Sequence, residues 1–167
     1  ANIVIIPAYS EFDYIDRTLD SIANCNFEFL KLVLVIVVIN NEKNPTVNDY
    51  NNNNNTYLKL KKRDDPFFLS VVDAFSPKKS IPFKYAGVGV ARKIGMDLAI
   101  QFSEGNSLLY CLDADTLVAS KYFKKITKIF YSKNISSAVV GFKHLQSDNP
   151  AIENAIRQYE LYLKSTA

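Results

Sequence analysis

The sequence is poor in the residues that mark several classes of protein. It has only two cysteines in 167 residues, and Cys25 and Cys111 are too far apart to indicate a disulfide framework. Because Cys111 lies within an apolar run, we expect it to be a buried free thiol in a reducing compartment. The single histidine, His144, is predicted to be a polar surface residue in a loop.

Long apolar segments and a strong net charge are also absent. The longest apolar block, Leu32–Ile39, has eight residues and is too short to cross a bilayer. No basic and apolar leader precedes Ile3, so the sequence predicts a cytoplasmic protein. The net charge is +3, from 20 basic and 17 acidic residues, which gives no reason to expect a nucleic-acid partner.

The length and the hydrophobic content are typical of one globular domain. With 167 residues, 48% of them hydrophobic, the chain can fill a single core, and we predict one domain over residues 1–167. Short β-branched apolar runs alternate with segments of helical periodicity. The predicted strands are Ile3–Ile6, Leu32–Ile39, Phe67–Phe75, Leu108–Leu112 and Ala138–Phe142. The first predicted helix follows an N-cap at Ser10 and has its apolar positions within residues 15–23. The other predicted helices cover residues 91–102, 122–130 and 152–163.

This alternation predicts an α/β fold with a mainly parallel sheet and helices on both faces. Right-handed crossovers would then bring every loop that follows a strand to the same edge of the sheet. Those loops begin near Pro7, Asn40, Phe75 and Asp113. We therefore expect the functional residues to lie along that edge.

Two polar segments each allow two interpretations. The run Asn51–Asn55 has no evident packing value and is either a surface loop or a helix start of low complexity. Lys121, Lys124, Lys125 and Lys128 form a stripe at helical spacing. The stripe suits peripheral contact with an anionic membrane surface, or it is the solvated face of an amphipathic helix.

The segment LLYCLDADT, at residues 108–116, carries the clearest chemical signal. Its apolar run stops at Asp113 and Asp115, which are spaced as a DxD motif. At the carboxyl end of a buried strand, where open α/β sheets bind ligands, two carboxylates suit a divalent cation that carries a phosphate group. The alternative is an ordinary solvated turn.

Three segments together resemble the family 2 glycosyltransferases of the GT-A fold: IVIIPAYSEFDYIDRTLDSI near the start, GVGVARKIGMDLAI at residues 87–100, and LLYCLDADT. They occur in the family's order across about residues 2–145. The sequence departs from the family at Ser10 and Lys93, where asparagine is usual, and at Asn40 and Asn41, where an acidic pair is common. The resemblance implies a Rossmann-like half that binds a nucleoside-diphosphate sugar, with a UDP-sugar favoured.

The resemblance also implies roles for individual residues. The first loop, with Pro7, Ala8, Tyr9 and Glu11, would hold the base and ribose, unless it is only a loop leading into a helix. Asn40 would accept the uracil N–H in place of a carboxylate, or it is simply a turn former with Asn41.

The remaining roles concern the diphosphate. Arg92 would contact the base or diphosphate, the alternative being a surface arginine paired with Asp97 or another acid. Asp113 would hold the ribose or a metal-bound water, and Asp115 would ligate Mn²⁺ or Mg²⁺.

The resemblance implies metal-dependent, inverting sugar transfer to an acceptor that the sequence does not identify. We find no general base, so the catalytic residues stay unknown, and we expect this chain to be the inactive donor-binding part of a longer enzyme. It would lie in the cytoplasm, either free or at the inner face of a membrane. A nucleotidyltransferase would need a glycine-rich loop after the first strand, which PAYSEF does not provide. A non-catalytic nucleotide-binding or interaction module, derived from the same fold, is the other alternative.

Overall fold

The computed structural model describes residues 2–26, 28 and 30–166. It divides into two compact units, Ala1–Ser132 and Lys133–Ala167. One domain over residues 1–167 stays a prediction. Within the described residues, no helix is both long enough and apolar enough to cross a membrane.

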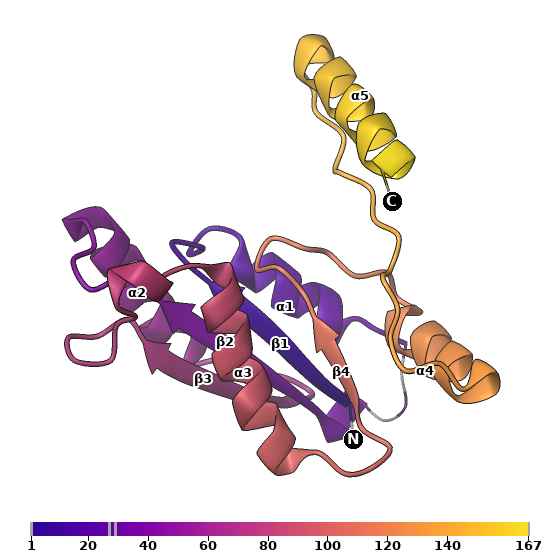
Figure 1. The fold of residues 1–167 in the computed structure, drawn as a ribbon, viewed down its shortest axis with the longest axis horizontal. Helices are drawn as coiled ribbons and strands as arrows, with labels where there is room; N and C mark the ends of the chain where they lie inside the picture. The colour runs from indigo at the N-terminus through magenta and orange to yellow at the C-terminus, as the bar shows by residue number, and fades with distance from the viewer. Residues whose placement is uncertain (1, 27, 29, 167) are drawn as a thin grey trace. The chain divides into compact units, whose positions relative to one another are not determined.

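The first unit is built on a parallel sheet whose order is β3-β2-β1-β4 (Figure 1). Its strands are β1 (Asn2–Ala8), β2 (Val33–Asn40), β3 (Phe68–Ala74) and β4 (Leu108–Cys111). The helices are α1 (Ile15–Ala23), α2 (Val47–Leu60), α3 (Val88–Phe102) and α4 (Tyr122–Lys133), and α5 (Pro150–Thr166) belongs to the second unit. Every strand pair is parallel, so the predicted α/β fold is confirmed.

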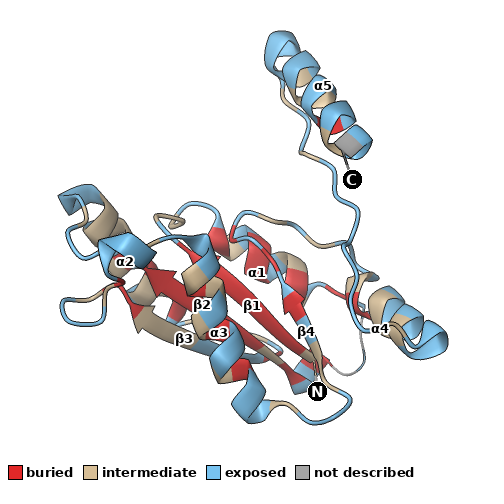
Figure 2. Cartoon of the chain, viewed as in Figure 1, coloured by how far each residue is buried: buried red, intermediate tan, exposed pale blue. Residues whose placement is uncertain are grey.

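Alternate residues of the central strands enter two cores, one on each face of the sheet. Val4, Ile6 and Val37 pack with α1 and α2, whereas Ile5 and Val38 pack with α3. β1 and β2 are the most buried elements in Figure 2, because helices cover both faces of the sheet at these strands. Strands that are buried on both faces have continuous apolar sequences, as these two do.

The first strand and the first helix differ from the sequence prediction. β1 does not stop at Pro7, which pairs with Val38. The carbonyl of Ile5 accepts a hydrogen bond from the N–H of Leu112, so the backbone groups of Ile5 point toward β4. Pro7, two residues later, has its backbone nitrogen on the same edge. Because β4 has already ended there, the missing N–H of the proline has no strand partner to lose. α1 begins at Ile15, and Ser10 is not its N-cap, because Ser10 has a φ of 58° and its hydroxyl is bonded elsewhere.

Two further predictions are wrong. Residues 138–142 form no strand, and Val139 is 98% exposed. A strand needs a partner strand for its backbone hydrogen bonds, and the described part of the second unit contains none. Cys111 is exposed because β4 is an edge strand with one open face, whereas the buried free thiol is Cys25.

The second unit is held together by charge. Arg157 bonds to Glu153 at 2.5 Å and to Glu160 at 2.7 Å. The contact with Arg157, and the bonds that the backbone N–H and ring of His144 make to the same carboxylate, hold the pKa of Glu160 at about 2. His144 therefore connects the segment before α5 to α5 itself. The prediction of a simple polar surface residue did not include this contact.

The close contact of α3 with the sheet gives a stability test. A methyl group added at Gly95 would lie 2.4 Å from Cγ2 of Ile5 and 3.2 Å from Cγ2 of Val38. We expect Gly95→Ala to lower the free energy of unfolding by about 1–3 kcal/mol in urea titrations. Gly89→Ala, in the same helix with nothing within 4 Å, should be neutral or stabilising. Equal effects at the two positions would contradict this packing.

Candidate functional site

The strand order changes direction between β1 and β4. From β1 the chain moves to β2 and β3 on one side, then returns to place β4 on the other side. The loops after β1 and β4 diverge at such a point and leave a crevice at the carboxyl ends of the strands. The loop after β1 contains Glu11, and the loop after β4 contains Asp113 and Asp115.

An ion pair connects α3 with the loop after β4. Nη2 of Arg92 donates to Oδ1 of Asp113 at 2.7 Å, and the side chains are 32% and 64% exposed. Asp97 does not pair with Arg92, because it bonds to Lys93 one turn along the helix. Nε of Arg92 is buried and has no partner among the described residues, so the guanidinium retains an unused donor.

Three carboxylates gather at this crevice. Burial raises the pKa of Glu11, and the charges of Asp115 and Asp113 raise it further. Glu11 therefore interacts with Asp113 and Asp115, and only Asp113 is paired with Arg92 among the described residues, so the excess of negative charge suits a cation.

The donor set fits a metal that is shared with a ligand. Among the described residues, no cluster of three histidine, cysteine or acidic side chains is arranged to hold a metal ion. Asp113 and Asp115 are both exposed at a strand end, however, and present hard oxygen atoms. Mg²⁺ and similar ions are commonly held by one or two carboxylates, with phosphate oxygens and water as the other ligands.

Helix α2 fixes the loop after β1 by side-chain contacts that the sequence did not predict. Oδ1 of Asn53 accepts from the N–H of Ser10 at 2.9 Å, and Oδ1 of Asp49 accepts from the Ser10 hydroxyl at 2.6 Å. Oδ1 of Asn52 accepts from the N–H of Phe12 at 3.1 Å, and Nζ of Lys59 lies 3.9 Å from the Phe12 ring centroid. These bonds hold Ser10 in a left-handed conformation that a serine rarely adopts.

Asn53 is the centre of this network. Its Nδ2 donates to the carbonyl of Asn40 at 3.1 Å and to Oδ1 of Asn41 at 2.7 Å. Asn53 and Asn41 are both 0% exposed. The asparagine run therefore has a packing role, and the prediction that it has none is wrong. Thr46 is the N-cap of α2, and its hydroxyl accepts from the N–H of Asp49 at 3.1 Å; a threonine before this segment was the signal in the sequence for a helix there.

The other predicted site residues lie at the same edge in different environments. Tyr9 is 43% exposed, and the pKa of its hydroxyl is raised by burial and by a hydrogen bond to Asp49. Ala8 is 1% exposed and packs in the core with α1, so only its backbone reaches the edge. Asn40 ends β2 on the α3 face and is 4% exposed.

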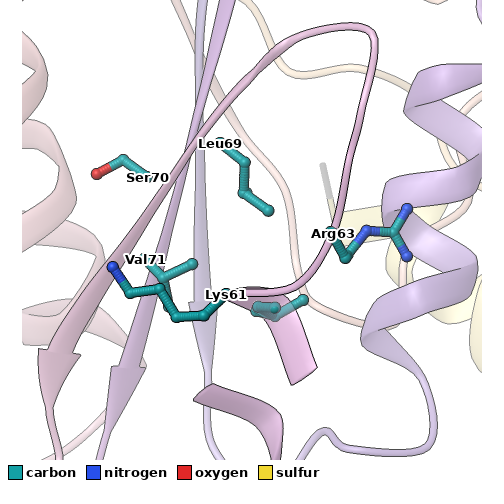
Figure 3. A pocket seen from close by; sticks show the side chains of 6 residues that line it. Lys61, Arg63, Leu69, Ser70 and Val71 are labelled. Carbon is teal, nitrogen blue, oxygen red and sulfur yellow. The ribbon is translucent and has the colours of Figure 1, made fainter. Parts of the chain in front are cut away.

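A pocket of about 250 Å³ lies away from this edge, beside the first half of β3 (Figure 3). It is lined by Leu60, Lys61, Arg63, Leu69, Ser70 and Val71. Arg63 already bonds to Asp16, Asp20 and Asp65, so its charge is satisfied. The pocket has no acidic or histidine lining residue that could act as a general base for Ser70, and it is not a candidate active site.

Comparison with known proteins shows the class of fold. No family model matches the sequence, and no curated protein matches it either. The crystal structure of S. aureus TarS residues 1–349 in complex with UDP-GlcNAc is similar, with a TM-score of 0.50 and 19% identity over 87% of this chain. The TarS 1–349 structure without that ligand gives a TM-score of 0.49 and 20% identity. TarS is a glycosyltransferase, so the fold is glycosyltransferase-like. This chain spans about 37% of the TarS chain.

The Asn53 network can be tested by its effect on stability. We expect Asn53→Ala to lower the free energy of unfolding by about 2–3 kcal/mol, because it leaves the Ser10 N–H and the oxygens of Asn40 and Asn41 without a partner. Asn55→Ala, at an exposed position of the same helix, should be neutral or slightly stabilising. Urea titrations of both variants make the comparison, and equal stabilities would show that the network contributes nothing.

Proposed function

We propose that this chain is the donor-binding part of a family 2-like glycosyltransferase and binds a nucleoside-diphosphate sugar in a metal-dependent way. The observation that carries the proposal is the Arg92–Asp113 ion pair, which lies beside Asp115 and Glu11 at the point where the strand order reverses. The glycosyltransferase-like fold supports it, as does a neighbour of that fold crystallised with UDP-GlcNAc.

In this proposal the charge of the site selects the ligand. A diphosphate alone would be repelled by three carboxylates that only one arginine opposes. Asp115, with Asp113, would hold Mn²⁺ or Mg²⁺, and such a cation, when bound, offsets the negative charge that develops on a nucleoside-diphosphate leaving group. The partly exposed guanidinium of Arg92 suits a phosphate or base oxygen.

The nucleoside would occupy the edge formed by the first loop and the end of β2. The half-exposed ring of Tyr9 offers a stacking surface, and its hydroxyl is held by Asp49. The side-chain amide of Asn40 would offer a donor and an acceptor to a pyrimidine base. Asn41 would have a structural role instead, because its amide oxygen is already bonded to Asn53.

The reaction itself extends the proposal beyond the donor. We infer that the sugar is transferred with inversion, in the cytoplasm or at a membrane face. We assign the general base to no residue of this chain and do not identify the acceptor. The proposal therefore concerns donor binding, and its test does not depend on turnover.

The metal dependence can be measured by calorimetry with UDP. We expect Mn²⁺ to increase the affinity of the protein for UDP by at least about tenfold, and EDTA to abolish the increase. Asp115→Asn should remove this dependence. Asp97→Asn removes an exposed carboxylate of α3 that is paired with Lys93, and this variant should keep the dependence. Equal UDP affinity with Mn²⁺ and with EDTA would exclude the proposed site.

Arg92 provides a second, independent test of donor binding. Arg92→Gln should weaken UDP binding by about 10- to 100-fold through the loss of a charge-assisted hydrogen bond, with little change in stability because the ion pair is exposed. Lys93→Gln, the neighbouring cation on the same helix, should leave the affinity unchanged. UDP affinity that is the same in both variants would favour a module that has lost the donor site.

A further inference from the structure

A lysine-rich surface on α4 remains outside the donor site. Residues 116–147 contain six lysines and no aspartate or glutamate. Four of these lysines form what we call the lysine face: Lys121, Lys124, Lys125 and Lys128, all exposed. None of the four has an ion-pair partner among the described residues, whereas Lys59, Arg63, Lys79, Arg92 and Lys93 in the same unit are each paired with an aspartate.

The orientation of α4 is set by its opposite side. Phe123 is 0% exposed and packs edge-on against the ring of Tyr110, with centroids 5.1 Å apart. Thr127 shares a hydrogen bond with the Tyr110 hydroxyl at 3.1 Å, and Tyr131, at the border between the two sides, donates to the carbonyl of Asn106 at 2.8 Å. With one side anchored in this way, the lysine face is directed to solvent.

Exposed apolar side chains border the lysine face on both sides. With about 100° of rotation per residue, the four lysines cover about 100° of the helix surface. Ile129 lies just beyond Lys125 on one side, and Tyr131 lies just beyond Lys124 on the other. These two side chains are 45% and 60% exposed. A row of cations with apolar or aromatic flanks is the pattern that interfacial helices present to anionic lipid.

We propose that the lysine face of α4 docks this protein on an anionic lipid surface. The face contains lysine only, which suits diffuse attraction to a charged bilayer, whereas arginine is the residue that reads phosphates by bidentate bonds in nucleic-acid sites. Each lysine near such a surface contributes about fivefold to the binding constant, so the four together give several hundred-fold.

The docking surface is separate from the proposed donor site. The Tyr110 hydroxyl also bonds to Asn2, the first residue of β1, and Asn106 precedes β4. α4 thus lies by the amino ends of the strands (Figure 1), whereas Arg92 and Asp113 lie at the carboxyl ends. Lipid binding and UDP binding should therefore occur independently of each other.

The experiment is cosedimentation of the protein with vesicles of phosphatidylcholine, with or without phosphatidylserine. We expect binding only to the phosphatidylserine vesicles, with loss of binding between about 0.1 M and about 0.5 M salt. Lys124→Gln with Lys128→Gln should weaken binding by about 25-fold, and the matching Arg pair should retain it. Circular dichroism verifies that each variant is folded. UDP with Mn²⁺ should leave the binding unchanged.

The matched control is Lys61→Gln with Lys62→Gln, which removes two exposed charges at the end of α2. This pair should bind vesicles like the unmodified protein. Equal loss in the two pairs, equal binding to neutral vesicles, no binding to anionic vesicles, or tighter binding to duplex DNA than to the vesicles would each overturn the proposal.

Discussion

The geometry of the candidate site depends on one buried amide, the side chain of Asn53. A buried amide without partners costs several kcal/mol, so the fold must keep all of its hydrogen bonds in place at once. Those bonds reach Ser10 in the loop after β1 and both Asn40 and Asn41 at the end of β2. Three segments far apart in sequence are thereby locked together at the edge where the proposed ligand would bind.

Electrostatics then divides the residues of that edge into two groups. Bonds from Ser10 and Thr46 lower the pKa of Asp49, whose charge is used within the protein. Glu11 instead has a raised pKa, because burial and two neighbouring carboxylates disfavour its charge. Exposed ion pairs such as Arg92–Asp113 add little to stability. The acids at this edge are therefore not explained by a contribution to folding.

Much of the fold could be predicted because apolar periodicity is a local property of the sequence. The runs that became β1, β2 and β4, and the stripe of α3, are visible without knowledge of their neighbours. The network of Asn53 was not predictable, because asparagine has no packing preference until a particular partner faces it. Ser10 fits an N-cap by residue type, but long-range bonds to α2 decided its conformation. The segment 138–142 has strand composition but no partner strand among the described residues of its unit.

The same dependence on distant contacts explains why the chain can present two chemically opposite surfaces. The acids follow β4, and the chain from Ala114 to Ser120 then runs along α1, with bonds from Thr18 and Asn26 at its two ends. This path carries α4 from the carboxyl ends of the strands to their amino ends. Among the described residues, the lysines of α4 form no ion pair with Asp113 or Asp115, which lie at the other end of the sheet. An acidic crevice and a basic helix can coexist in one small unit because a single extended segment keeps them apart.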